Sequence, residues 1–429
     1  MDFNGLSIDQ APPISAPLRF FIMAPIFGIL VGFLLLFSDS ATLMNRYSID
    51  AIVVVHLITI GIFGFIMLGA LTQMLSVLAG VNIPKIETVA TFSHAALLLG
   101  LFSMVFGLEM SNTLLLRLAS LFLGSGFLVI IGSMLYAIKG VQHFTASIKG
   151  MSVALIFAFM IVLMGVYLLY GYSENDITGL HYIVANIHSV WAVFGFAGIL
   201  IIGVAFQVLP MFYVAPRFKQ FCKKRVVLLI STGLFIWMVL SIFAQEHTLY
   251  AKLWVTTFFW AFATTVWIKF NKRKRPVSDV TVWYWRAASI FLTLGSFLWI
   301  YDEFFKHEYI VMVGILIGGG FVLSIMLGML YKIVPFLVWF HLNALGYMTI
   351  PTINEMINKK FSRLQFLLLM LSLVGFIFSF YMSEFLIPSS LFFIVSMAIL
   401  EYNILAPVWI YHTTRKKKPD FDMSAFSMT

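Results

Sequence analysis

Two histidines lie inside long apolar runs of the sequence, where ionisable side chains are rare. His56 follows "AIVVV", and His188 precedes "SVWAVFGFAGIL". Imidazole is a good ligand for heme iron and for copper, and an ionisable group is costly in a lipid environment. The pair therefore predicts a bis-histidine heme held between two helices. The alternative is that each histidine satisfies only a hydrogen bond inside a helix bundle.

Glu401, in "AILEYNILAP", is the clearest charge inside an apolar run, and Lys332 lies in another such run. Two interpretations follow from their similar expected depth. Glu401 and Lys332 form a structural ion pair, or they begin a proton path from the cytoplasm together with Gln73 and Gln207. Polar side chains form such paths in membrane pumps.

Three further histidines carry separate predictions. His181 precedes His188 by seven residues, which places both on one helix face about 10 Å apart. His181 ends the acidic stretch "YSENDITGLH", and His307 lies in a second acidic stretch, "YDEFFKHEY". Imidazoles and carboxylates gathered at one surface can capture a divalent cation or copper, or they are solvated loop ends. His94, in "TFSHAALLLG", ligates a second cofactor or makes a hydrogen bond in the core.

The elements that must position these residues are membrane helices. The chain has 429 residues, of which 61% are hydrophobic and 10% are charged, and its mean hydropathy is +1.00. A water-soluble domain needs more charge to cover its surface. Runs of about 20 apolar residues, each long enough to cross a ~30 Å hydrocarbon core, recur along the whole length. The sequence predicts an all-α polytopic protein whose single membrane domain, residues 1–429, contacts the lipid bilayer.

About twelve spans are expected from the apolar runs. They cover roughly 17–37, 49–79, 88–108, 112–138, 150–170, 181–213, 226–244, 248–268, 282–301, 308–337, 364–382 and 386–412.

A repeated phrase divides these spans into three groups. It reads "GALTQMLS" from Gly69, "GVAFQVLP" from Gly203 and "GMLYKIVP" from Gly328, at the ends of spans 2, 6 and 10. Small residues in such helices let neighbouring backbones approach closely. The phrase predicts three tandem four-helix repeats in a pseudo-threefold arrangement. The repeats cover roughly 17–138, 150–268 and 282–412, and the equivalent polar residues are Gln73, Gln207 and Lys332.

The basic residues predict the orientation of the chain. Its net charge is +9, and most of the 27 Lys and Arg residues lie in loops after even-numbered spans and in the C-terminal tail. Examples are "RFKQFCKKR" (217–225) and "RKKK" (415–418). The positive-inside rule then places both termini in the cytoplasm, and we expect the protein in the inner (cytoplasmic) membrane. These runs can bind anionic lipid, and no nucleic-acid partner is expected.

With its histidines upstream of the phrase, this pattern resembles the catalytic subunit of the heme–copper oxidase superfamily, nearest the C-type oxidase and nitric oxide reductase branch. The stretches that carry the resemblance are 56–80, 188–212 and 318–336. In that family span 2 supplies an axial ligand to a low-spin heme, which His56 matches, and span 6 supplies a copper ligand, which His188 approximately matches. The resemblance also puts Arg117 within reach of a heme propionate, although an arginine there can instead snorkel to the headgroups.

The sequence departs from the family at the copper centre and at the remaining heme ligands. Span 10 supplies two more histidines in the family, but the corresponding positions here fall near Val313 and Ile315. Span 7 begins with a histidine pair in the family, and 226–243 contains none. Because one protein ligand cannot hold copper, the resemblance implies the fold without the family's reduction of oxygen or nitric oxide.

Three functions follow as alternatives. The first is a protein that binds heme b and transfers electrons or handles a small gas such as nitric oxide or oxygen. The second is a transporter or assembly protein that handles copper or heme. The third is a structural partner of a respiratory-complex subunit, with histidines that are only hydrogen-bonded. A quinone is a further candidate partner, and no catalytic residue is assigned.

Overall fold

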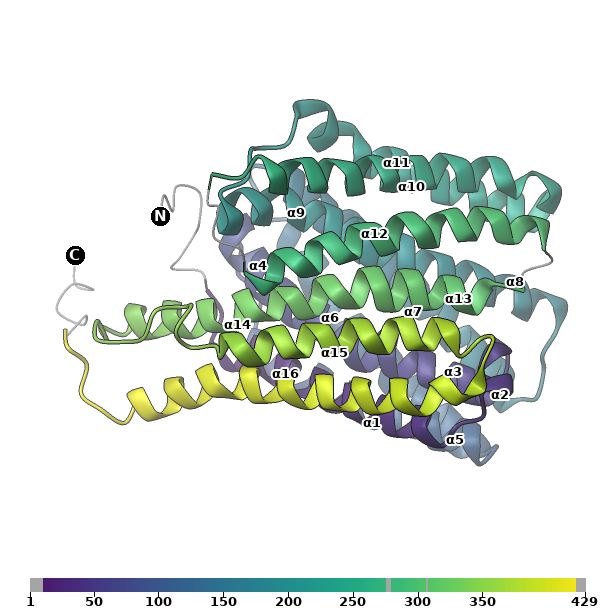
Figure 1. Ribbon diagram of the computed structural model, residues 1–429, viewed down its shortest axis with the longest axis horizontal. Helices are drawn as coiled ribbons and strands as arrows, with labels where there is room; N and C mark the ends of the chain where they lie inside the picture. The colour runs from purple at the N-terminus through teal and green to yellow at the C-terminus, as the bar shows by residue number, and fades with distance from the viewer. Residues whose placement is uncertain (1–10, 275–278, 306–307, 422–429) are drawn as a thin grey trace.

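The computed structural model describes residues 11–274, 279–305 and 308–421 of the chain. Figure 1 shows long helices that run roughly alongside one another along the longest axis of the molecule. Eleven helices in these ranges are long and apolar enough to cross a membrane. The chain is therefore an all-α, multi-pass membrane protein, as the sequence predicts.

The first half of the bundle contains helices α1 to α9. Their bounds are α1 Ser15–Phe37, α2 Ser40–Met44, α3 Ile49–His56, η2 Leu57–Gly64, α4 Phe65–Ala79, α5 Ile86–Glu109, α6 Thr113–Ile138, α7 Ala146–Ser173, α8 Gly179–Val190, η3 Trp191–Gly198 and α9 Ile199–Tyr213.

The second half continues to α16, and its described residues include three short 3₁₀ turns. Their bounds are α10 Gln220–Phe243, η4 Gln245–His247, α11 Thr248–Asn271, α12 Val280–Tyr301, η5 Asp302–Phe304, α13 Ile310–Gly314, η6 Ile315–Leu323, α14 Ser324–Ala344, α15 Lys359–Phe378, η7 Ser383–Phe385 and α16 Leu386–Thr414.

One expected span, 282–301, forms a helix that is less apolar than the sequence analysis assumed. It forms helix α12, which packs against α11, α14 and η6. It does not belong to the eleven strongly apolar helices, because Arg286 and several aromatic residues lower its hydropathy.

Polar side chains define where several helices begin. Asn112 Oδ1 accepts a hydrogen bond from Leu115 N at the start of α6, and Asn358 Oδ1 accepts from Lys360 N and Phe361 N at the start of α15. Such caps satisfy backbone N–H groups that have no partner within the helix. These loop residues therefore set the ends of the apolar helices.

Three of the spanning helices change to π-helical winding in their middle, in segments η2, η3 and η6. Each segment ends five residues before a glycine of the repeated phrase: Gly69, Gly203 or Gly328. In Figure 1, α3, α8 and α13 lie toward one end of the molecule and α4, α9 and α14 toward the other. The three helices therefore run in the same direction, and π turns in such helices are frequent at functional sites.

The glycines of the repeated phrase allow close approach to a neighbouring helix. A Cβ on Gly69 would lie 2.8 Å from the Phe21 ring of α1, and a Cβ on Gly203 would lie 2.8 Å from Gly150 Cα of α7. A Cβ on Gly328 would lie 2.7 Å from Tyr284 Cβ of α12. These distances are shorter than van der Waals contact. The predicted close approach of two backbones is therefore found at Gly203, whereas Gly69 and Gly328 make room for side chains of α1 and α12.

One glycine within each π segment, eight residues before the phrase glycine, faces a phenylalanine of the same neighbouring helix. A Cβ at any of these glycines would overlap the ring. The pairs are Gly61 with Phe27 of α1, Gly195 with Phe157 of α7 and Gly320 with Phe291 of α12.

Candidate functional site

A cavity of about 540 Å³ lies between the three helices that contain π segments. Residues of α3–η2, α8–η3 and α13–η6 line it together with side chains of α7 and α15, and its walls are mainly apolar. Its volume lies within the range of about 300–1,000 Å³ that is typical of ligand and cofactor pockets. The cavity is therefore large enough for a cofactor rather than for a lone ion.

His56 and His188 both line this cavity. Their ring centres are 6.3 Å apart, and their ring planes differ by 24°. Both side chains are half-buried. The structure thus brings together the two histidines that the sequence analysis paired.

Each of these imidazoles has one nitrogen engaged with a backbone carbonyl. His56 Nδ1 lies 2.7 Å from Ile52 O, and His188 Nδ1 lies 2.9 Å from Ile161 O of α7. A carbonyl oxygen only accepts, so each Nδ1 carries the proton and each neutral Nε2 keeps a lone pair. Metal-ligating histidines are oriented by this kind of hydrogen bond.

The distance between the rings fits one metal atom bound by both histidines. With metal–nitrogen bonds of about 2.0 Å, and ring centres about 1 Å behind each nitrogen, the centres would be roughly 6 Å apart. The observed 6.3 Å agrees with this separation. The same 6.3 Å also lies within the range of about 4.5–7 Å between the centres of offset aromatic rings, so the distance fits a shared metal without requiring one.

Arg46 is a lining residue that the sequence analysis missed. It lies between α2 and α3, and its Nη2 donates to Ser189 Oγ of α8 at 3.2 Å. Its guanidinium carbon lies 5.1 Å from the centre of the Tyr47 ring. One signal was available, because Arg46 stands in a loop on the side that the positive-inside rule leaves poor in basic residues.

His181 also lines the cavity, and it is buried rather than solvated. Its ring packs edge-on against Tyr172 at 5.2 Å, and its Nδ1 has no hydrogen-bond partner among the described residues. His307 lies outside the described residues. Within the ranges that the structure describes, no group of three or more His, Cys, Asp and Glu could hold a metal ion, so metal capture by His181 and His307 stays a prediction.

His94 packs against α1 away from the cavity. Its Nε2 lies 3.2 Å from Arg19 O, and its ring contacts the edges of Phe20 and Phe65. This contact corresponds to the hydrogen-bonded core role considered for His94. Ligation of a second cofactor by His94 stays a prediction.

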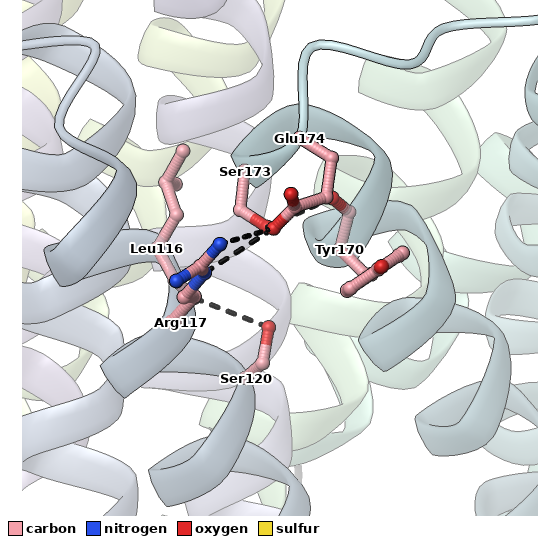
Figure 2. A network of polar contacts seen from close by, with 6 residues as sticks. All are labelled: Leu116, Arg117, Ser120, Tyr170, Ser173 and Glu174. Atoms are coloured by element: carbon pink, nitrogen blue, oxygen red, sulfur yellow. Dashed lines mark hydrogen bonds and ion pairs between the residues drawn. The ribbon is translucent and has the colours of Figure 1, made fainter.

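Arg117 forms an ion pair with Glu174 at one end of the bundle. Figure 2 shows its guanidinium facing Glu174, and the Nη2–Oε1 distance is 2.8 Å. Hydrogen bonds from Arg117 and from Ser173 hold the pKa of Glu174 below its ordinary value. The two side chains are 61% and 32% exposed, so the pair contributes little to stability. Arg117 is not among the residues that line the cavity, and a heme propionate would have to compete with Glu174 for it.

Lys332 pairs with Asp279 and not with Glu401. The Lys332 Nζ–Asp279 Oδ2 distance is 2.6 Å, and Asp279 also accepts a hydrogen bond from Thr281 N as the cap of α12. Among the described residues Glu401 Oε2 is buried without a hydrogen-bond partner. The predicted Lys332–Glu401 ion pair was therefore wrong, because the loop before α12 brings a nearer carboxylate to Lys332.

The two glutamines of the predicted polar layer lie in different environments. Both polar atoms of the Gln73 side chain are buried, and they have no hydrogen-bond partner within the described part of the chain. Gln207 is exposed. A proton path through Gln73, Gln207, Lys332 and Glu401 stays a prediction.

Comparison with known protein families and with curated proteins finds no match for this chain. Its function is therefore inferred from the geometry of the cavity and of the two histidines.

Proposed function

We propose that this chain is a heme-binding integral membrane protein in which His56 and His188 bind one heme b from its two faces. The observation that carries the proposal is the pair of imidazoles, whose centres lie 6.3 Å apart in one cavity of about 540 Å³. Each imidazole has its Nδ1 bonded to a backbone carbonyl, which leaves Nε2 for iron. When bound, the heme would supply a one-electron redox centre.

The chain's own residues prepare this site before any ligand enters. Ile52 O and Ile161 O fix the tautomer and the rotation of the two rings. Apolar residues such as Phe63 and Phe194 line the same cavity as the histidines, and an apolar wall lowers the local dielectric and tunes a bound redox group. Ligands on two packed helices are held more rigidly than ligands on loops.

Electron transfer is the activity that this ligand set favours. Two imidazoles on one heme iron leave no open coordination position, so handling of nitric oxide or oxygen would require His56 or His188 to leave. A membrane quinone or a respiratory-complex subunit is the partner class proposed for such a protein. The oxidase reaction of the heme–copper family is not part of the proposal, because it needs a copper ligand set beyond these two histidines.

The proposal includes the fold of the heme–copper oxidase family, with three tandem four-helix repeats about a pseudo-threefold axis. Two repeated features support it. The π segments η2, η3 and η6 each end five residues before a phrase glycine. The glycine–phenylalanine contacts to α1, α7 and α12 recur at the same spacing from that glycine.

The proposal also places the protein in the inner membrane, with both termini in the cytoplasm. Figure 1 shows the C-terminal end of α16 at the same end of the bundle as α4, α9 and α14. The basic run 217–225 covers the end of the loop after α9 and the start of α10, and the run 415–418 directly follows α16. Their position at one end agrees with the positive-inside rule.

Absorption spectra test the heme directly. Detergent-purified protein is recorded oxidised and dithionite-reduced, beside His56→Ala, His188→Ala and, as a matched control, His94→Ala. The wild type and His94→Ala should show sharp reduced bands, which vanish or become high-spin in the other two variants. A colourless wild type, even when expressed with added heme, would refute the proposal.

Copper handling is the second candidate, and one observation favours it. Met67 and Met104 line the same cavity as the histidines, and thioether and imidazole ligands both suit copper. Metal analysis of the purified protein separates the two functions. Heme iron without copper supports the heme protein. A colourless protein that contains copper and mediates copper flux in vesicles supports a transporter or assembly protein.

A further inference from the structure

The guanidinium of Arg46 lies in the wall of the cavity, close along the chain to one of the proposed ligands. Its hydrogen-bond partner, Ser189, is the residue next to His188, and both line the cavity. The polar residues Tyr47 and Asn186 line it too. A cation and neutral polar groups are therefore gathered at one part of a mainly apolar cavity.

The known contacts of Arg46 leave most of its hydrogen-bonding capacity unused. A guanidinium carries five N–H donors, and Arg46 makes one 3.2 Å bond to a hydroxyl and a contact with the Tyr47 ring. No carboxylate of the described residues forms an ion pair with it, whereas Arg117 has Glu174 and Lys252 has Glu303. An oxyanion bound by two parallel N–H groups would use the remaining donors and supply a counter-charge.

We propose that Arg46 forms an anion subsite of the cavity, positioned by Ser189, which binds an anionic oxygen group of the cavity's occupant. For a heme this group is a propionate carboxylate, and that identification rests on the function proposed above. For a lipid it is the headgroup phosphate. An occupant bound by both His188 and Arg46 would be held in one orientation within the cavity.

Esterified heme tests whether Arg46 recognises a carboxylate. The full chain, purified from heme-depleted cells, is titrated with heme b and with its dimethyl ester, which lacks both negative charges. Esterification should weaken binding to the wild type by about tenfold or more, as expected for loss of a charge-assisted hydrogen bond. In Arg46→Ala the two forms should bind equally, and Arg46→Lys should be intermediate because it retains charge without the bidentate geometry.

Arg286 provides a matched control. It also donates to one polar side chain, Asn271, and lies over a ring, Trp267, but it is not among the lining residues. Arg286→Ala should keep the full effect of esterification. The subsite is overturned if that effect persists in Arg46→Ala or disappears instead in Arg117→Ala.

Failure of the proposed function remains distinguishable from failure of the subsite. If the wild type binds neither form of heme, the heme proposal fails, and the subsite is tested with phosphatidylglycerol against phosphatidylcholine by native mass spectrometry. Selective retention of phosphatidylglycerol that is lost in Arg46→Ala, and kept in Arg286→Ala, would assign the phosphate as the ligand. Equal retention by Arg46→Ala and the wild type would overturn the anion subsite.

Discussion

Replacing Gly203 by alanine should destabilise the bundle, because the added methyl group meets the backbone of another helix. A Cβ at Gly203 would lie 2.8 Å from Gly150 Cα and 3.2 Å from Gly150 C on α7. Non-bonded carbons prefer about 3.5–4.0 Å. Both nearest atoms belong to the backbone, so no side-chain rotation can relieve the overlap, and α7 and α9 must separate by roughly 1 Å.

That separation sets the size of the effect. A gap of about 0.5–1 Å already loses a quarter to a half of the dispersion energy of each contact, and overpacking of this kind costs about 1–3 kcal/mol. Replacing glycine by alanine also raises helix propensity by about 1 kcal/mol. Gly132→Ala on α6 is the matched control, because nothing lies within 4 Å of its Cβ position and the propensity gain is common to both variants.

The assay is the free energy of unfolding of each purified variant in one detergent, from a denaturant titration. Gly203→Ala should be less stable than Gly132→Ala by about 1–3 kcal/mol. Gly150→Ala should behave like Gly203→Ala, and the double variant should be non-additive because the two methyl groups occupy the same contact. Equal stabilities of Gly203→Ala and Gly132→Ala would refute the close packing of α7 against α9.

Two further predictions concern ion pairs. Lys252 is buried and pairs with Glu303, which also accepts a hydrogen bond from Thr248 Oγ1. Lys252→Met should therefore lower the unfolding free energy by about 3 kcal/mol, and Glu303→Gln added to it should recover part of that loss. The prediction is contradicted if the single variant loses no more stability than the double variant. Burial of Asp279 opposes its ionisation, but the Lys332 ammonium and the hydrogen bonds from Lys332 and Thr281 outweigh it and hold the pKa of the Asp279 carboxyl below its ordinary value. This pair therefore contributes stability above the ordinary carboxyl pKa of about 4 and loses it as the pH falls through the lower folded-state pKa. Unfolding measured against pH should show this acid loss in the wild type and a flatter profile in Asp279→Asn, and identical profiles would refute the contribution.

The sequence by itself determined the membrane character and most of the helices. A run of about 20 apolar residues has few stable alternatives to a spanning helix, because every backbone group must find its partner within the segment in lipid. The similar spacing before Gly69 and Gly203, 13 and 15 residues, also placed His56 and His188 at comparable depth. For this reason their pairing could be predicted before any contact was known.

Only the tertiary structure decided which polar groups meet. Lys332 reaches Asp279 rather than Glu401, Arg117 reaches Glu174, and Arg46 turns into the cavity toward Ser189. These partners depend on the rotation of each helix and on the path of the loops, and an apolar sequence pattern leaves both undetermined. The π winding beside His56 and His188 was equally invisible, because it changes which carbonyl each N–H reaches without changing the hydrophobicity of the segment.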